Sequence, residues 1–353
     1  MNLRIEKLKE LFRENNVDGM IVENPKNIKY LTNLDDDGIL IINKSENVFI
    51  TYSMFIEDVN NKITLDDEII VAEYSNLNEQ DYFDFFDDCN RVYFEENYIT
   101  YSKYNEMIRK FRIKEAVESN NIIEKLREIK DDEEIENVEK ACNITDECFL
   151  FLQDYIKVGM TEKQVATKIL EFFLENGADG LAFDTIVASG KNTSIPHSKP
   201  TDKVIEEGDA VLIDFGAKVN GYSSDMTRTF FMGDVSEENA KLYDLVLYAQ
   251  KNALEKMINN ADANLIAKGV ENIFNANNFT LIHALGHGVG LDIHEKPIIS
   301  TRRKEFLKEN MIVTDEPGIY IPGKIGIRIE DTVLINNMSQ TVLTKSNKNL
   351  MII

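Results

Sequence analysis

The chain of 353 residues has no tryptophan, four histidines, six prolines and only three cysteines. The cysteines are odd in number and lack the spacing of metal ligands, which argues against a disulfide framework and a cysteine zinc site; they are Cys89, Cys142 and Cys148. Ordinary buried thiols in a reducing, cytoplasmic compartment are therefore expected. No apolar run approaches the ~18 residues that a membrane helix needs, and residues 1–6 show no signal-peptide core.

Positive charge is also scarce. Lysine and arginine number 39 against 62 aspartates and glutamates, so the formal net charge is −23. Because a surface this negative repels phosphate backbones and anionic lipids, neither nucleic acid nor a membrane surface is expected as a partner. Hydrophobic residues make up 43% of the chain. At ~150 residues per domain, this composition and length predict a folded protein of about two domains.

Glycine, proline and histidine are concentrated in the later part of the chain. Only Gly19 and Gly38 precede residue 120, whereas the other 15 glycines lie between residues 159 and 326. Five of the six prolines and all four histidines also follow residue 190. Glycine permits tight turns, and histidine supplies ligands and proton transfer. The chemistry is therefore expected in the C-terminal two-thirds, with the first third as a support or specificity domain.

The first third alternates between helical and strand patterns. Apolar spacing predicts helices over 3–16 and near 54–60, 79–87 and 100–110. Short apolar runs predict strands over 19–22, 38–42, 48–50, 68–71 and 91–94. Together these patterns predict an α/β sheet with a mixed strand order.

The acidic stretch 130–134 opens a long amphipathic helix that is expected to reach about residue 157. Asp131 or Asp132 is the expected N-cap, because carboxylates are favourable in the first turn. A charge run of this kind is also typical of a plain solvated face. Here it is interpreted as the start of the second domain.

Residues 210–230 predict a β-hairpin that carries two aspartates. The Asn-Gly pair at 220–221 separates two strand-like runs and favours a type I′ turn, which needs positive φ at both central positions. With a two-residue loop, paired positions sum to 441. Asp225 then lies opposite Gly216, which leaves space, and Asp214 lies on the same face. Two carboxylates directed into one space repel unless a cation lies between them. The alternative is the polar outer face of an ordinary hairpin.

Residues 282–297 hold three of the four histidines in a glycine-rich stretch. His283 and His287 have the i,i+4 spacing of a zinc-binding helix, but the glycines around them argue against a helix, and no His-Glu-x-x-His occurs. A phosphate-binding loop would need a Lys-Ser/Thr element that is missing. Histidines can be satisfied core residues, but three together in such a backbone favour a functional site.

Two further acids lie at apolar strands. Glu316 follows the run 311–315 and precedes a Pro-Gly turn. The alternation of 325–335 predicts one strand with Arg328 and Glu330 on the same face. A glutamate in so apolar a strand is expected to be a ligand or to be paired, so a simple ion pair between Glu330 and Arg328 stays open.

The candidate metal ligands are four carboxylates and one imidazole: Asp214, Asp225, His287, Glu316 and Glu330. Oxygen-dominated ligation with one nitrogen suits Mn²⁺, or Co²⁺ by replacement, better than structural Zn²⁺. Four negative charges are excessive for one ion and appropriate for two. A two-metal site activates water for hydrolysis, so the residues predict two divalent metal ions and a hydrolytic reaction.

In order and spacing, these motifs resemble the metallopeptidase family that contains Xaa-Pro dipeptidase (prolidase), aminopeptidase P and methionine aminopeptidase. The resemblance covers nearly the whole chain and rests on segments 27–32, 196–198, 214–225, 283–297, 316–320 and 328–331. It implies an α+β fold in which a C-terminal pita-bread catalytic domain, residues 129–353, follows a smaller α/β creatinase/prolidase-type N-terminal domain, residues 1–122. The N-terminal domain distinguishes the chain from single-domain methionine aminopeptidases.

The resemblance also implies a role for each metal ligand. Asp214 would bind the first metal, and His287 with Glu316 would bind the second. Asp225 and Glu330 would bridge both metals.

By the same resemblance, Glu316 would be the general base that takes a proton from a water bridging the metals. His197 and His294 would contact the substrate and stabilise the tetrahedral intermediate. His283 would line the pocket for the residue after the scissile bond, and Arg328 would orient the neighbouring glutamate or bind a substrate carboxylate.

The implied function is that of a metal-dependent peptidase acting on small peptides that begin Xaa-Pro. The compact chain favours a dipeptidase over an aminopeptidase P that takes longer peptides. A creatinase-like amidinohydrolase is metal-free in this family, and a non-catalytic binding module would have lost a ligand, so retention of all five ligand positions argues against both. Relatives with this two-domain organisation are usually dimeric, so a homodimer is expected.

The chain departs from the family pattern at three positions that are not ligands. Asp315 precedes the ligand Glu316 where an apolar residue or asparagine is more usual, and Asn310 and Asn33 stand where glycine is common. A charge beside Glu316 is expected to affect the pKa of that carboxyl.

Overall fold

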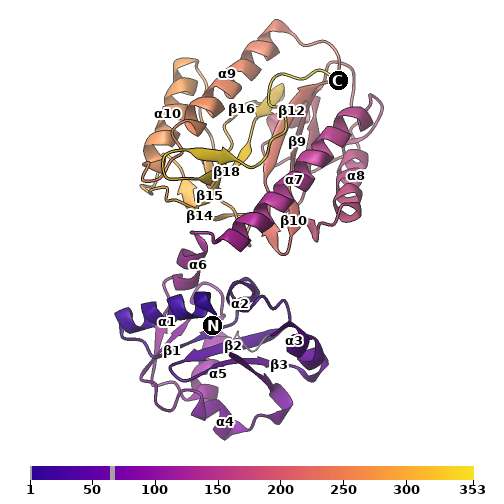
Figure 1. Cartoon of the computed structure of the whole chain (residues 1–353). Helices are drawn as coiled ribbons and strands as arrows, with labels where there is room; N and C mark the ends of the chain where they lie inside the picture. Colours follow the sequence, from indigo (N-terminus) through magenta and orange to yellow (C-terminus); the bar gives the residue numbers. More distant parts are fainter. Residues whose placement is uncertain (1, 64–67) are drawn as a thin grey trace. The chain divides into compact units, whose positions relative to one another are not determined.

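The structure is a computed structural model that describes residues 2–63 and 68–353. The chain forms two compact units, Met1–Arg127 and Glu128–Ile353, and each is described by itself (Figure 1). Among the described residues, no helix combines the length and apolar character needed to cross a membrane.

The N-terminal unit is built on one six-stranded sheet of order β4-β3-β2-β1-β5-β6. Its strands are β1 (Gly19–Val22), β2 (Gly38–Asn43), β3 (Asn47–Thr51), β4 (Ile69–Glu73), β5 (Arg91–Phe94) and β6 (Glu115–Glu118). β2 is antiparallel to β1 and β3, whereas β4 runs parallel to β3, and β5 runs parallel to β1 and β6. The mixed α/β sheet expected from the sequence is confirmed.

Helices border this sheet, and α4 (Glu79–Asp84) and α5 (Tyr101–Phe111) share an apolar core with it. The other helices are α1 (Leu3–Asn15), α2 (Pro25–Thr32), α3 (Ile56–Lys62) and α6 (Ile122–Arg127), with short 3₁₀ turns η1 (Ser53–Phe55) and η3 (Tyr74–Asn76). The core joins sheet residues such as Ile41 and Val92 to Phe86 and Phe111. Neither α2 nor β6 was expected from the sequence. α2 has only eight residues, and β6 is a partly exposed edge strand with too few apolar residues to show a period.

The C-terminal unit contains thirteen short strands among its described residues. They are β7 (Gly180–Leu181), β8 (Ile186–Ser189), β9 (Ala210–Phe215), β10 (Ala217–Val219), β11 (Tyr222–Ser223), β12 (Met226–Phe231), β13 (Gly286–Gly288), β14 (Glu295–Ile299), β15 (Ile312–Asp315), β16 (Gly318–Ile321), β17 (Ile325–Arg328), β18 (Asp331–Ile335) and β19 (Gln340–Val342). They form sheets of order β12-β9-β8, β11-β10-β7 and β14-β13-β15-β18-β19, and a β16-β17 hairpin.

Two pairs of helices cover these sheets (Figure 1). They are α7 (Asp132–Tyr155) and α8 (Glu162–Glu175), then α9 (Glu237–Leu254) and α10 (Ala263–Ala276). The first pair shares a buried core with β8, β9, β10 and β12, and the second pair shares another with β15, β17 and β18. This is the α+β architecture that the resemblance implied, and it places the strands between the helix pairs.

Helix α7 begins where the acidic stretch predicts. The Asp131 side chain accepts a hydrogen bond from the Glu134 backbone N–H at 3.0 Å, and the Glu134 carboxylate accepts one from the Asp131 N–H at 3.0 Å. This reciprocal capping box satisfies two N–H groups that the helix itself leaves without partners. The alternative of a plain solvated charge run is therefore wrong for Asp131, which is the N-cap.

The single strand expected over 325–335 is wrong. The structure divides it into β17, which pairs with β16, and β18, which pairs with β15 and β19. At the break, the Ile329 N–H donates to the carbonyl oxygen of Pro317, and the Glu330 N–H donates to that of Thr227 at 3.1 Å. Because these two N–H groups bond to different parts of the unit, the chain leaves one sheet and enters the other at Glu330.

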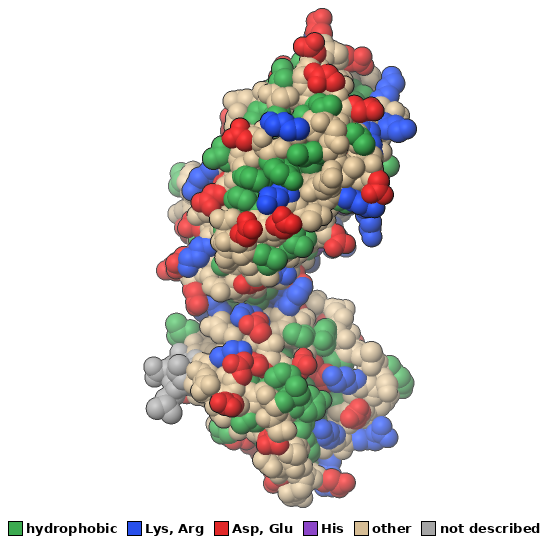
Figure 2. All heavy atoms as spheres, turned by 90° about the vertical axis from the view of Figure 1, so that its right-hand side faces the viewer, with side chains coloured by type: hydrophobic (Ala, Val, Ile, Leu, Met, Phe, Trp, Pro, Cys, Tyr) green, Lys and Arg blue, Asp and Glu red, His purple; other side chains and the backbone are tan. Residues whose placement is uncertain are grey.

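Charged side chains are scattered over the face of each unit that Figure 2 shows. On the face in Figure 2, acidic and basic groups are interspersed rather than separated into blocks. The formal net charge of −23 therefore reflects a general excess of acids, and on this face it is not concentrated in one patch.

Candidate metal centre

The hairpin between β9 and β12 has the register that its Asn-Gly pair predicts. Asn220 and Gly221 both have positive φ, 50° and 83°, as a type I′ turn requires. Asp214 pairs with Thr227, so the predicted sum of 441 is confirmed. The turn chemistry of two residues thus sets the positions of two acids several residues away.

The space opposite Asp225 is not open, as the sequence had suggested. A Cβ on Gly216 would lie 1.9 Å from the carbonyl oxygen of Ser224, which fills the position. The Ser224 hydroxyl lies 2.6 Å from that of Thr145 on α7, and both accept a hydrogen bond from the Ala217 N–H. Glycine is therefore required because the two chains approach closely just before Asp225.

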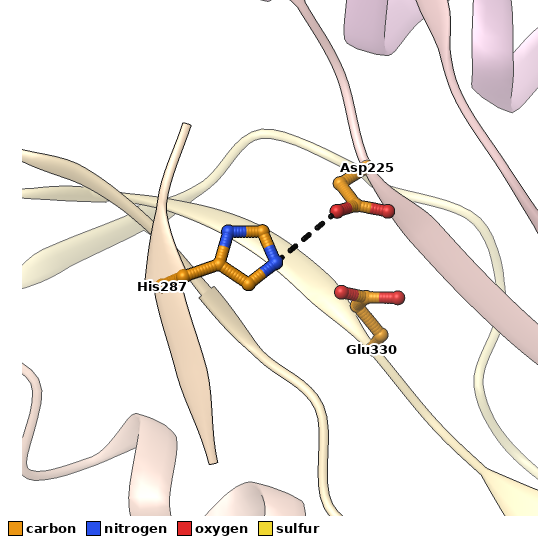
Figure 3. A group of neighbouring side chains, drawn as sticks. All are labelled: Asp225, His287 and Glu330. Atoms are coloured by element: carbon orange, nitrogen blue, oxygen red, sulfur yellow. Dashed lines mark ion pairs between the residues drawn. The ribbon is translucent and has the colours of Figure 1, made fainter. Parts of the chain in front are cut away.

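Asp225, His287 and Glu330 point toward one another from three different segments (Figure 3). Asp225 immediately precedes β12, His287 lies in β13, and Glu330 lies between β17 and β18. All three residues are buried, and one ligand atom from each lies within 4.8 Å of the others. His287 Nε2 is 3.6 Å from Asp225 Oδ2. The three side chains can therefore face a common cation.

Glu316 extends this group from the connection between β15 and β16. Its Oε1 lies 3.5 Å from His287 Nε2. The Thr314 hydroxyl donates to Glu316 Oε1 at 3.3 Å and accepts from the His287 N–H at 3.1 Å. One hydroxyl, that of Thr314, thus binds both the backbone of His287 and the carboxylate of Glu316.

Asp214 has one buried carboxylate oxygen without a hydrogen-bond partner. Arg328 Nη2 donates to Asp214 Oδ2 at 2.5 Å, while Asp214 Oδ1 is buried without a hydrogen-bond partner. Arg328 also donates to the Thr227 hydroxyl at 2.9 Å, and that hydroxyl donates to Glu330 Oε2 at 2.6 Å. Arg328 therefore forms its ion pair with Asp214 and not with Glu330, the partner that the sequence had left open. Thr227 lies between Arg328 and Glu330 and is hydrogen-bonded to both.

Burial and mutual repulsion raise the pKa values of these acids. Burial, then the charges of Glu330 and Asp214, raises the pKa of Asp225 well above its usual range. Burial, then the charges of Glu316 and Asp214, does the same for the pKa of Glu330. Burial also raises the pKa of Glu316. A divalent cation removes this penalty, because it supplies the opposite charge that buried carboxylates need. The donor set and the unpartnered oxygen of Asp214 thus fit a metal centre.

His287 presents the correct atom for ligation. Its Nδ1 lies 3.0 Å from the Gly288 carbonyl oxygen. Because that oxygen only accepts, Nδ1 carries the proton, and the lone pair of Nε2 faces the acids. Burial lowers the pKa of the imidazole, which favours the neutral form that binds metal.

The other three histidines lie around this centre. His294 stacks edge-on against His287, with ring centroids 4.4 Å apart. His283 Nε2 lies 3.1 Å from the Tyr320 hydroxyl. His197 is exposed on the long connection between β8 and β9. Burial lowers the pKa of His294, which favours its neutral form.

Several residues that position the acids were not expected from the sequence. Tyr320 accepts from Arg328 Nη1 at 2.6 Å, and burial raises the pKa of Tyr320 to about 12. The Thr332 hydroxyl donates to the Asp225 carbonyl oxygen at 2.7 Å. Their sequence signal is a polar residue within an apolar strand. Buried polar groups are nearly always hydrogen-bonded, so such a residue is expected to have a specific partner.

Comparison with known proteins gives matches over the whole chain. Residues 136–337 match metallopeptidase family M24, and residues 4–129 match the creatinase/prolidase N-terminal domain. The chain is 35% identical over 357 residues to the Xaa-Pro dipeptidase of Pyrococcus furiosus, with 99% of this chain and 100% of that protein covered.

Solved structures are similarly close. An Xaa-Pro dipeptidase from Bacillus anthracis has a TM-score of 0.93 at 32% identity, with 99% of each chain covered. An X-Pro aminopeptidase from Thermotoga maritima has a TM-score of 0.89 at 30% identity, with 96% of this chain and 98% of that chain covered.

Proposed function

This chain belongs to metallopeptidase family M24 and carries a creatinase/prolidase N-terminal domain, and on that premise we propose that it hydrolyses the bond between an N-terminal residue and a following proline. Its preferred substrates are Xaa-Pro dipeptides. The observation that carries the proposal is the group of buried carboxylates facing one neutral imidazole. We further propose the domain limits 1–122 and 129–353.

The group that the family implies is a pair of divalent ions, which we propose to be Mn²⁺, with Co²⁺ as the alternative. Asp214, Asp225, His287, Glu316 and Glu330 would hold them. When bound, the ions would polarise the substrate carbonyl and acidify water.

Glu316 is the proposed general base. Its Oε1 accepts from Thr314, and the other oxygen, Oε2, would take a proton from the attacking water. The same carboxyl would return that proton to the proline nitrogen as the peptide bond breaks.

His197 and His294 are proposed to contact the substrate and to donate to the oxyanion of the tetrahedral intermediate. His283 is proposed to line the pocket for proline. Its Nδ1 lies 2.7 Å from the Ala284 carbonyl oxygen, which fixes the ring. Arg328, held by Asp214, is proposed to position the acids and to attract a substrate carboxylate.

Aminopeptidase P activity on longer Xaa-Pro peptides is the second candidate, because the similarity extends to the Thermotoga maritima X-Pro aminopeptidase. A creatinase-like amidinohydrolase and a non-catalytic module are disfavoured by the complete ligand set. We also propose a homodimer and a cytoplasmic location, the latter because all three cysteines are free and buried. A monomer by light scattering at micromolar concentration would contradict the dimer.

The test is hydrolysis of Ala-Pro and Ala-Pro-Ala by the full chain with Mn²⁺. For a dipeptidase, kcat/KM for Ala-Pro exceeds that for the tripeptide by at least about a hundredfold, roughly 2.7 kcal/mol. Comparable values would move the assignment to aminopeptidase P, and no cleavage of either would refute the peptidase proposal. Glu316→Gln should lower kcat by about a hundredfold or more, whereas Glu309→Gln, a change at an exposed acid nearby, should not.

A further inference from the structure

The connection between β8 and β9 carries His197 but has little regular structure of its own. Between Ser189 and Thr201 it contains only the 3₁₀ turn η4 (Gly190–Ser194). His197 lies beyond that turn and is exposed. Something other than a β-ladder must therefore fix the place of this imidazole.

Glu162, the first residue of α8, is completely buried and faces both ends of this loop. Its Oε1 accepts from the Ser189 N–H at 2.7 Å, the Ser189 hydroxyl at 3.0 Å and Asn192 Nδ2 at 3.0 Å. Its Oε2 accepts from the Thr201 N–H at 3.0 Å and the Thr201 hydroxyl at 2.6 Å. One oxygen thus holds the outgoing end of the loop and the other holds the returning end.

The helix does not need this carboxylate as a cap. Thr161 accepts from the Gln164 N–H, and the Gln164 side chain accepts from the Thr161 N–H. Burying a carboxylate is costly unless hydrogen bonds satisfy it, and hydrogen bonds to an ionised acceptor are the stronger kind. All five donors to the Glu162 carboxylate come from the loop, so its hydrogen bonds stabilise the loop and not the helix N-terminus.

The far side of the loop contacts strand β17. The Thr193 hydroxyl accepts from the Gly326 N–H at 2.8 Å, and Arg328 Nη1 donates to the Pro196 carbonyl oxygen at 3.3 Å. Pro196 directly precedes His197. The loop is therefore held at its base by Glu162 and near its tip by the strand that carries Arg328.

We propose that Glu162 is a positioning residue that closes the 189–201 loop and thereby sets the place of His197. The inference rests on the proposed function, in which His197 contacts the substrate. Glu162 does not touch the substrate; it acts through the loop.

The experiment uses Glu162→Gln in the full chain loaded with Mn²⁺. A glutamine retains one acceptor oxygen and turns a donor toward the other end, so one end of the loop is released. Hydrogen exchange within 189–201 should become at least about tenfold faster. The kcat on Ala-Pro should fall by about tenfold, with KM changed less than about twofold and metal content unchanged, because the loop's imidazole would act in the transition state.

A double-mutant cycle with His197→Ala separates positioning from general damage. In the His197→Ala background, Glu162→Gln should lower kcat by less than about twofold, because the residue it positions is gone. The proposal would be overturned if the kcat losses of Glu162→Gln and His197→Ala multiplied in the double variant. It would also be overturned if hydrogen exchange within 189–201 were unchanged in Glu162→Gln. Glu171→Gln, a change at an exposed acid of the same helix, is the matched control and should leave both measurements unchanged.

A second variant covers a folding failure of Glu162→Gln. Thr201→Val removes one donor from the returning end and should increase exchange in the loop in the same direction. Hydrogen exchange is measured without substrate, so it does not depend on the proposed function. If the wild type cleaves no Xaa-Pro peptide but Glu162→Gln still speeds exchange within 189–201, the proposed function is refuted, whereas the role of Glu162 in closing the loop is retained.

Discussion

Substitution of Asp225 by asparagine should change the stability of the chain in opposite directions with and without metal. The side chain lies in a buried group whose ligand atoms are within 4.8 Å of one another. Asparagine is almost isosteric but carries no charge. In a metal-free protein it removes repulsion, and in a metal-loaded protein it removes a ligand.

The size of the first effect follows from the geometry. Ligand atoms of Asp225 and Glu330 lie within 4.8 Å of each other, and two unit charges at that upper limit repel by about 3.5 kcal/mol at an effective dielectric constant of ~20. Uptake of a proton by one acid relieves part of this cost. The net gain of Asp225→Asn in EDTA should therefore be about 1–3 kcal/mol, which raises the Tm by several degrees for a domain of about 200 residues.

The size of the second effect follows from mass action. Each ion present at about a hundred times its Kd stabilises the folded chain by ~2.7 kcal/mol. An amide has one acceptor oxygen and cannot bridge two ions. The variant should therefore lose the contribution of at least one ion, and its metal content should fall below two per chain.

The pH dependence has a definite sign. Burial, followed by the neighbouring acids, raises the pKa of Asp225 in the folded chain, so the folded state holds a proton that the unfolded state has released. Stability of the metal-free wild type then falls as the pH rises above about 4, the pKa of an aspartate in the unfolded chain, toward the raised pKa of the folded state. The advantage of Asp225→Asn in EDTA should grow over the same interval.

Thermal unfolding of both proteins, in EDTA and in Mn²⁺ at pH 5, 6, 7 and 8, measures all of these effects. Asp154→Asn, a change at an exposed acid of α7, is the control and should follow the wild type. A variant that is less stable than the wild type in EDTA, and that Mn²⁺ stabilises as much as it stabilises the wild type, would contradict both effects.

Three further outcomes are expected. Because burial raises the pKa of each of the three cysteine thiols, the native chain should react with a thiol reagent at pH 8 far more slowly than the denatured chain, which should titrate three thiols. Burial would raise the pKa of Asp331, but Arg228 and Lys348 hold it below its usual value; Asp331→Asn should cost about 3–5 kcal/mol in urea unfolding at pH 7, a difference that shrinks below pH 4. Gly216→Ala should destabilise the chain and reduce its metal content, measured by elemental analysis, because its Cβ would lie 1.9 Å from the Ser224 carbonyl oxygen.

The part of the site that the sequence predicted best is the part fixed by local turn chemistry. Asn220 and Gly221 specify a turn type, the turn specifies the register, and the register places Asp214 opposite Thr227. Each step depends on neighbours in the chain and needs no knowledge of the distant fold.

The break at Glu330 could not be predicted in the same way. The alternation of apolar residues continues through it, so a period-2 pattern indicates one strand. The chain changes sheets there because the Glu330 N–H donates to the carbonyl oxygen of Thr227, which is 103 positions away in the sequence. Such a contact exists only in the folded unit.

Residues that position the ligands were missed for a related reason. Thr314, Tyr320 and Thr332 resemble ordinary strand residues, and Glu162 resembles a favourable acid at a helix N-terminus. Their roles depend on which donors and acceptors the fold brings to them. The ligands themselves were visible because acids and histidine are unusual in apolar or glycine-rich segments.

Stepwise addition of Mn²⁺ to the EDTA-stripped full chain, with elemental analysis and Ala-Pro hydrolysis measured at each step, tests the two-metal peptidase most directly. We expect no hydrolysis by the stripped chain, two ions bound per chain at saturation, and activity that rises with occupancy of this pair. Full hydrolysis by a chain shown to be free of metal, or none by a chain that holds two ions, would contradict this expectation.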